Sequence, residues 1–153
     1  MNWPDVIKQI ACGICDSTIS EKIKPTSREI VTCGGLRQIL RTRFPEGEIY
    51  LSDSTYLLCS VADISKFLQQ DGTNKCKYQT EAYDCDNFSY RLMGQFSVPD
   101  WGQLAFGIVW SNFHALNLFV DEQRKVWFVE PQNDNILEDL EPWMGTTIRF
   151  IVM

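Results

Sequence analysis

Cys85 and His114 are the two residues of this chain whose types and places suit covalent chemistry. Cys85 lies in Tyr-Asp-Cys-Asp-Asn-Phe, before a stretch with helical spacing, and His114 lies in Phe-His-Ala-Leu-Asn, at the start of a stretch with strand spacing. A cysteine attacks as its thiolate, which a helix N-terminus and a nearby imidazolium both favour. The chain has one histidine, so any imidazole base must be His114. The pair predicts a thiol hydrolase.

A third group must orient the imidazole, and the next stretch of strand offers Glu130. Residues 121–125 have the composition of a hairpin loop, and the loop length decides where Glu130 lies. A five-residue loop pairs Val120 with Val126 and places Glu130 on the face of His114. A three-residue loop places Glu130 opposite His114, whereas a four-residue loop turns it to the other face, and a triad would then need a bulge.

The neighbours of the cysteine raise a charge problem. Asp84 and Asp86 suit the first turn of a helix, but they oppose a thiolate if they point at the sulfur, so orientation or a bound cation must offset them. For an oxyanion hole we expect the backbone N–H of Cys85 and one side-chain donor, for which Gln79 is the nearest candidate. Residues 133–135, rich in Asn and Asp, predict a turn, with a cation site or an imidazole contact as the alternative.

Apolar spacing predicts the helices that would hold these residues. Helical spacing covers residues 28–43, 60–70 and 87–96, and Ser60 suits the N-cap of the second helix. The third helix would bury its aromatic residues and leave Cys85 near its N-terminus. Residues 47–53 fit either a short strand or an exposed loop.

The second half of the chain predicts strands, because runs rich in β-branched and aromatic residues alternate with turn signals. These strands are expected at residues 104–110, 114–120, 126–129 and 146–152. Helices would precede an antiparallel sheet, so the predicted class is α+β, with N-terminal helices packed on a small antiparallel sheet.

Length and charge limit the kinds of protein this can be. The 153 residues fit a single domain, with residues 1–25 as a candidate helical extension before the break near Pro25. A formal charge of -6 argues against nucleic acid as a partner. The sequence contains no run of about eighteen apolar residues, so we expect no membrane span. It does not start with a basic segment followed by an apolar run, so we expect no signal peptide. We therefore expect a cytoplasmic protein, and the sequence leaves its oligomeric state open.

The six cysteines are expected to be mostly reduced, since no secretory context supports disulfides. Cys12 and Cys15 form a Cys-x-x-Cys that could be half of a zinc site or a redox pair, but a second half is missing. Cys85 alone would more often be a core residue than a nucleophile. The chain also has the order of a cysteine before a helix, a histidine on a strand and an acidic residue on the next strand. With this order, a catalytic role for Cys85 is about as favoured as a role in core packing.

These segments resemble the papain-like protease domains of the Marasmius oreades agglutinin family. The resemblance covers residues 83–133, through the motifs Tyr-Asp-Cys-Asp-Asn-Phe, His-Ala-Leu-Asn and Val-Glu-Pro-Gln-Asn. It implies a papain-like fold and a calcium-activated cysteine peptidase with Cys85 as nucleophile, His114 as base and Glu130 as orienting acid. It also implies Asp86 as a calcium ligand, while Asn87 stands where the family would have a second acid.

A cysteine peptidase acting on peptides or proteins is thus the leading hypothesis, with no other cofactor required. One alternative is a non-catalytic module that holds a peptide or protein in a papain-like cleft. Another is a cell-wall peptide amidase, which would share the same three residues.

Overall fold

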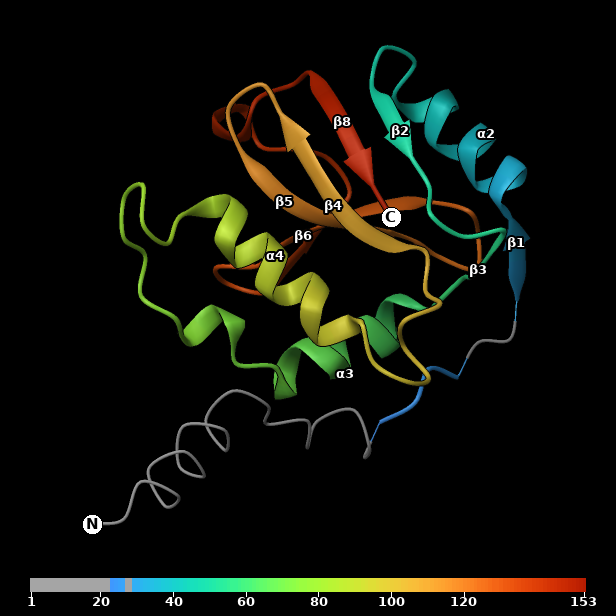
Figure 1. Cartoon of the computed structure of the whole chain (residues 1–153), viewed down its shortest axis with the longest axis horizontal. Helices are drawn as coiled ribbons and strands as arrows, with labels where there is room; N and C mark the ends of the chain where they lie inside the picture. Colours follow the sequence, from blue (N-terminus) through green and yellow to red (C-terminus); the bar gives the residue numbers. More distant parts are fainter. Residues whose placement is uncertain (1–22, 27–28) are drawn as a thin grey trace, which may run out of the picture.

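The computed structural model describes residues 23–26 and 29–153 (Figure 1). The expected helical extension over residues 1–25 lies outside this part except for 23–25, which form no helix or strand. The Cys12 and Cys15 pair also lies outside it. Within the described residues no helix is long and apolar enough to cross a membrane. The expected cytoplasmic location stays a prediction.

Most of the described strands belong to one six-stranded sheet. In sheet order these are β2 (Glu48–Tyr50), β8 (Ile148–Val152), β4 (Phe106–Ser111), β5 (Ala115–Val120), β6 (Val126–Glu130) and β7 (Asn135–Leu137). All neighbours pair antiparallel except β2 and β8, which pair parallel. A second, two-stranded sheet joins β1 (Ile30–Thr32) to β3 (Thr55–Leu57).

The expected architecture of N-terminal helices packed on a small antiparallel sheet is therefore wrong. Eight strands and three α-helices are described, and strand β1 precedes the first of those helices. The main sheet is mixed because the last strand, β8, enters between β2 and β4. That pairing joins segments about a hundred residues apart, which the local patterns of the chain do not encode.

The three described helices are α2 (Cys33–Arg43), α3 (Val61–Gln70) and α4 (Cys85–Phe96). The predictions for α3 and α4 are confirmed within two residues at each end. The first helix was predicted to begin at residue 28, but α2 begins five residues later. The β-branched run of β1 precedes it, and Thr32 caps α2 by accepting a hydrogen bond from Gly35 N at 3.2 Å.

Helices cover the sheet through two hydrophobic clusters. Leu36 and Leu40 of α2 belong to one cluster with alternate residues of β5, including Leu116 and Leu118. The residue between these two in the chain, Asn117, points instead toward α4. The second cluster joins α3 and α4 to the sheet through Ile64, Phe67, Leu92, Phe96, Phe106, Phe119 and Val129. In Figure 1, α4 lies across one face of the sheet. The period of two along β5 thus separates the two layers.

The buried carboxylate of Asp63 ties the start of α3 to the segment before β1. Asp63 is 2% exposed, and its Oδ2 accepts hydrogen bonds from Thr26 N at 2.8 Å and Thr26 Oγ1 at 2.7 Å. Its backbone N–H donates to the N-cap Ser60 Oγ at 3.1 Å. Burial raises the pKa of Asp63, but the hydrogen bonds from Thr26 and Ser60 outweigh burial, so its pKa lies below the usual 3.8.

Replacing Asp63→Asn should therefore lower the free energy of unfolding at neutral pH by about 2 kcal/mol, because charged hydrogen bonds are lost. A depressed carboxyl pKa gives stability that is present above the unfolded-state pKa and is lost as pH falls through the folded-state pKa. The difference between parent and variant should shrink below about pH 4. Urea unfolding across pH measures it, with exposed Glu46→Gln as control. An equal difference at neutral and acid pH would contradict this role for the charge.

Candidate functional site

Cys85 and His114 line the same surface cavity, of about 270 Å³. Cys85 is the first residue of α4, and His114 directly precedes β5. The cavity therefore opens where the N-terminus of one helix meets the end of a central strand. Other side chains that line it include Asp84, Asp86, Trp110, Asn112, Phe113 and Arg149. The structure thus brings together the two residues that the sequence singled out.

The backbone of His114 is held by Ser111, the last residue of β4. Ser111 Oγ accepts from His114 N at 2.9 Å, and Ser111 N donates to His114 O at 2.9 Å. The same hydroxyl donates to Met144 O, which joins the tight β4–β5 connection to the segment before β8. The ring of Trp143 lies 5.0 Å from the imidazole, centroid to centroid. His114 is 9% exposed, so its ring is fixed and nearly enclosed.

Glu130 contacts the imidazole. His114 Nε2 and Glu130 Oε2 are 2.6 Å apart, and Glu130 is 2% exposed. The second oxygen, Oε1, accepts from Gln132 N at 3.2 Å. Both oxygens of this buried carboxylate have partners, which its desolvation requires.

The hairpin register is that of the five-residue loop. Val120 pairs with Val126, and the ladder continues as far as Asn117 with Val129. The predicted contact between His114 and Glu130 is confirmed for this loop length. The catalytic roles given to Cys85, His114 and Glu130 stay predictions.

A buried amide fastens α4 to the sheet. Asn117 is fully buried, and its Nδ2 donates to Ser89 O of α4 and to Gly107 O of β4, both at 3.1 Å. At the start of α4, Ser89 Oγ donates to Cys85 O at 2.9 Å. The bonds of Asn117 fix the helix that carries the thiol relative to β4 and to β5, the strand that follows His114.

The acidic residues beside Cys85 interact with each other. A hydrogen bond with Asp84 raises the pKa of Asp86, and burial and the charge of Asp84 raise it further. Asn87, where the family resemblance led us to expect an acid, instead accepts from Asp84 N at 3.1 Å and caps α4. No group of three or more His, Cys, Asp or Glu among the described residues could hold a metal. Calcium at Asp86 stays a prediction.

Gln79 is not among the residues that line the Cys85 cavity. It is exposed and closes a turn with Tyr83, in which Gln79 N donates to Tyr83 O at 2.9 Å and Tyr83 N donates to Gln79 O at 2.8 Å. Its predicted oxyanion role gains no support from this position. The residues that sequence reasoning missed, Asn112 and Arg149, come from the β4–β5 turn and from β8, and no local pattern marks them.

The rim of the cavity is shaped by a glycine. Asn112 Oδ1 accepts from Thr147 N at 3.3 Å, and Asn112 N donates to Thr147 O at 2.9 Å. Gly145 has a φ of 87°, and a Cβ added there would lie 2.2 Å from Asn112 Oδ1. The loop before β8 can approach Asn112 this closely only with glycine at this position.

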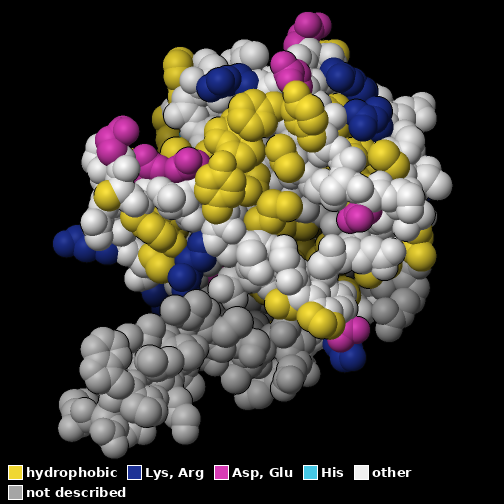
Figure 2. All heavy atoms as spheres, viewed as in Figure 1, with side chains coloured by type: hydrophobic (Ala, Val, Ile, Leu, Met, Phe, Trp, Pro, Cys, Tyr) yellow, Lys and Arg dark blue, Asp and Glu magenta, His cyan; other side chains and the backbone are white. Residues whose placement is uncertain are grey.

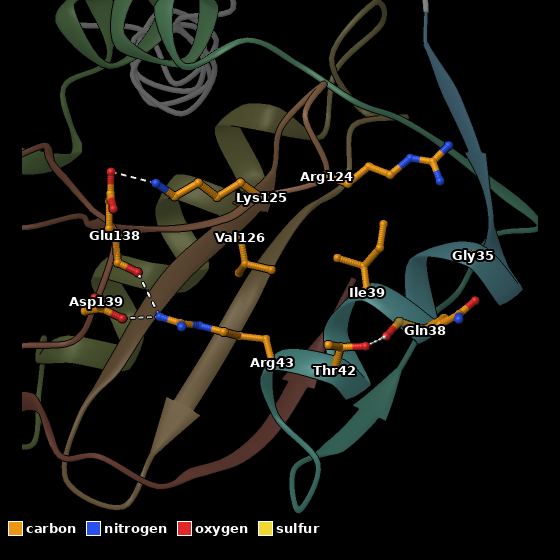
Figure 3. A pocket seen from close by; sticks show the side chains of 10 residues that line it. All are labelled: Gly35, Gln38, Ile39, Thr42, Arg43, Arg124, Lys125, Val126, Glu138 and Asp139. Atoms are coloured by element: carbon orange, nitrogen blue, oxygen red, sulfur yellow. Dashed lines mark hydrogen bonds and ion pairs between the residues drawn. The ribbon is translucent and has the colours of Figure 1, made fainter.

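A larger cavity of about 690 Å³ lies between α2 and the β5–β6 loop (Figure 3). Its cations are already paired, since Lys125 Nζ lies 2.6 Å from Glu138 Oε1 and Arg43 pairs with Asp139. In Figure 3 Arg124 points away from these pairs, and its guanidinium lies 3.7 Å from Glu29. The lining includes neither cysteine nor histidine. The smaller cavity at Cys85 is therefore the better candidate site.

Comparison with known proteins gives a fold but no family. No family model matches the chain, and no curated protein matches it. The chain is similar to a solved structure described as "PSL1a-E64 complex", with a TM-score of 0.70 and 24% identity over 83% of this chain and 51% of that chain. It is also similar to Polyporus squamosus lectin, described as bound to the human-type influenza-binding epitope Neu5Aca2-6Galb1-4GlcNAc. There the TM-score is 0.67 and the identity 24%, over 83% of this chain and 50% of that chain.

The chain thus spans about half the length of the solved structures it matches. These findings correct the sequence-based assignment to papain-like agglutinin-family proteases, because the structures that share the fold are those of a lectin. The predicted papain-like fold, the cysteine peptidase activity and the peptide or protein substrate are corrected with it. The two alternatives, a peptide-binding module and a cell-wall amidase, have no support from them either. The error arose because short motifs describe a local site and not a topology.

The amide of Asn117 offers a test of how the site is positioned. Asn117→Ala would leave two buried carbonyls without this donor, so the free energy of unfolding should fall by about 2 kcal/mol. Urea unfolding measures the loss, with exposed Gln123→Ala on the β5–β6 loop as the matched control. Equal stability of Asn117→Ala and the parent would mean that the amide does not fasten α4.

Proposed function

We propose that this chain is a carbohydrate-binding domain whose binding site is the cleft at Cys85 and His114. The observation that carries the proposal is the fold shared over 83% of the chain with a lectin described as bound to a glycan epitope. The match covers only about half of each solved lectin chain. Glycan binding by this chain therefore requires one of two things. Either the matched half of the lectin chain is the half that contacts the glycan, or the cleft of this chain binds sugar by itself.

Aromatic side chains beside the cleft support a sugar-binding surface. Figure 2 shows hydrophobic side chains gathered over β4 and β8. Trp110 lies between Tyr90 and Phe150, with ring centroids 5.7 Å and 4.4 Å apart respectively. Tyr90 is 53% exposed, and Phe113 on the cleft rim is 75% exposed. Exposed aromatic rings of this kind offer flat faces to the C–H groups of a sugar ring, and exposed apolar patches mark binding sites.

Polar side chains in the same cleft suit sugar hydroxyls. Asp84 and Asp86 offer carboxylate acceptors, Asn112 offers an amide, and Arg149 offers guanidinium donors. A few polar groups at the edge of an apolar surface are what orients a small ligand in a pocket. Arg149 also lies over the ring of Phe150, at 5.8 Å, which keeps its charge next to the aromatic row.

A glycan array probed with the full chain tests the proposal, with the sialylated epitope named above and its unsialylated core among the glycans. Phe113→Ala should weaken binding by about five- to tenfold, because an aromatic contact is worth roughly 1 kcal/mol. Tyr50→Ala is the matched control, since Tyr50 is 55% exposed on β2 and does not line the cleft. No glycan bound by the parent, or equal losses in both variants, would reject the cleft as a sugar site.

We propose a second role for the same site, a reactive thiol at Cys85. The specific observation is that Cys85 at a helix N-terminus shares the cleft with His114, which contacts buried Glu130 at 2.6 Å. One structure with this fold is described as a complex with E64. The proposal concerns covalent capture of an electrophile and makes no claim of hydrolysis.

Iodoacetamide measures this reactivity directly. The sulfur of Cys85 forms a bond to the alkylating carbon, iodide leaves, and the thiol proton passes to His114. Labelling followed by peptide mapping should show Cys85 as the fastest described thiol, and Glu130→Gln should slow it by about tenfold or more. Cys33→Ser, which removes a half-buried thiol elsewhere, is the control. Labelling of Cys85 at the same rate in the parent and in Glu130→Gln would exclude activation of the thiol by His114 and Glu130. The same comparison can be repeated with E64 as a second probe.

A further inference from the structure

The cavity between α2 and the β5–β6 loop is large enough for a small organic ligand. Its volume of about 690 Å³ is more than twice that of the cleft at Cys85, about 270 Å³, and lies in the range of pockets that hold such ligands. Ile39 of α2 and Val126 of β6 form an apolar part of its wall, and both also pack in the core under α2. An apolar ligand group therefore has a surface to cover.

The lining of this cavity is positive, although the chain as a whole is acidic. Arg43 comes from α2, and Arg124 and Lys125 come from the loop, whereas Glu138 and Asp139 are the two acidic side chains of the lining. Three positive and two negative groups leave one net positive charge there, against a formal charge of -6 for the chain. A hollow lined mainly by one sign of charge attracts ligands of the other sign, so this balance favours an anion.

The ion pairs that hold two of these cations are exposed and easily replaced. Lys125 Nζ lies 2.6 Å from Glu138 Oε1, and Arg43 pairs with Asp139. The acidic side chains are 59% and 77% exposed, and each cation is 44% exposed. Such pairs stabilise a protein little, because water competes for both partners. Figure 3 shows both cations reaching toward the same end of the cavity. An anion there can take the place of the two carboxylates.

Arg124 occupies a backbone position that favours glycine. Its φ is 62°, a left-handed conformation that costs energy for a residue with a side chain. Its backbone N–H donates to Asp121 O at 2.8 Å, a bond that does not need the arginine side chain. The guanidinium lies 3.7 Å from Glu29, and a pair between exposed side chains at this distance stabilises the fold little. An arginine at a strained position points to a use of its charge.

We propose that this cavity binds a small organic anion, with its phosphate or carboxylate group between Arg43 and Lys125 and its apolar body against Ile39 and Val126. A guanidinium can donate two parallel hydrogen bonds to such a group, and the ammonium supplies a second positive charge. Contact with the apolar wall removes the body of the ligand from water. Arg124 adds positive charge from the loop. The site is separate from the cleft, and it depends on neither the proposed glycan binding nor the proposed thiol reactivity.

Calorimetric titration of the full chain with four probes tests the proposal. 1-Naphthyl phosphate and 1-naphthoate join an apolar ring to an anionic group, 1-naphthol has the ring without the charge, and inorganic phosphate has the charge without the ring. At least one of the two ring anions should bind about tenfold or more tightly than 1-naphthol and inorganic phosphate, because both parts of the ligand contribute. Added NaCl should weaken this binding.

Two variants locate the bound anion. Lys125→Gln should weaken binding of the ring anion by about tenfold, since a charged hydrogen bond is lost. Arg124→Gly should weaken it by about threefold without lowering the melting temperature, because glycine adopts a positive φ without strain. A purely structural role for Arg124 would not separate affinity from stability in this way. Lys66→Gln is the matched control, since it removes one exposed cation of α3 outside the cavity and should leave the affinity unchanged.

Several outcomes would overturn the proposal. These are no binding of either ring anion, equal affinity for 1-naphthol, and equal affinity in Lys125→Gln and the parent. An equal loss in Lys66→Gln would mean that the anion responds only to the total charge of the chain. A loss in Arg149→Gln with none in Lys125→Gln would place the anion in the cleft at Cys85 instead.

Discussion

The carboxylate of Asp121 sets the register on which the candidate site depends. Its Oδ1 accepts from Gln123 N and Lys125 N, both at 2.9 Å, and its Oδ2 accepts from Trp127 Nε1 at 2.7 Å. These three bonds close the β5–β6 loop at five residues. Since a shift by one residue would turn every side chain of β6 to the other face, the loop length decides whether Glu130 can reach His114.

The two faces of β5 contact different helices. Leu116 and Leu118 complete the core under α2, while Asn117 points to α4 and bonds its backbone. The buried amide is an unusual residue for such a position. The two hydrogen bonds that Nδ2 donates offset the desolvation of the amino group, while Oδ1 is buried without a partner in the protein. The helix that carries Cys85 is consequently held by the same strand that His114 precedes. The thiol, the imidazole and the carboxylate are placed by neighbouring parts of one hairpin and one helix.

Periodicity in the sequence predicted the parts of the fold that are long and local. α3, α4 and the β5–β6 hairpin follow apolar spacing over about ten residues each, and the contact between His114 and Glu130 follows from one loop length. The three-residue strands β1 and β7 are too short to show a period. The parallel pairing of β2 with β8 joins distant segments, so no window of sequence contains it. The peptidase assignment failed for a related reason, since motifs of five or six residues carry no topology.

Gly145 limits which substitutions the cleft rim can accept. Its missing side chain lets the loop before β8 approach Asn112, and any other residue would displace that loop or the cleft rim. A position with no functional group of its own therefore constrains how the binding surface can diversify. A side chain at Gly145 would require matching changes at both Asn112 and Phe113, because the added Cβ would lie 2.2 Å from Asn112 Oδ1 and 3.2 Å from Phe113 Cδ2.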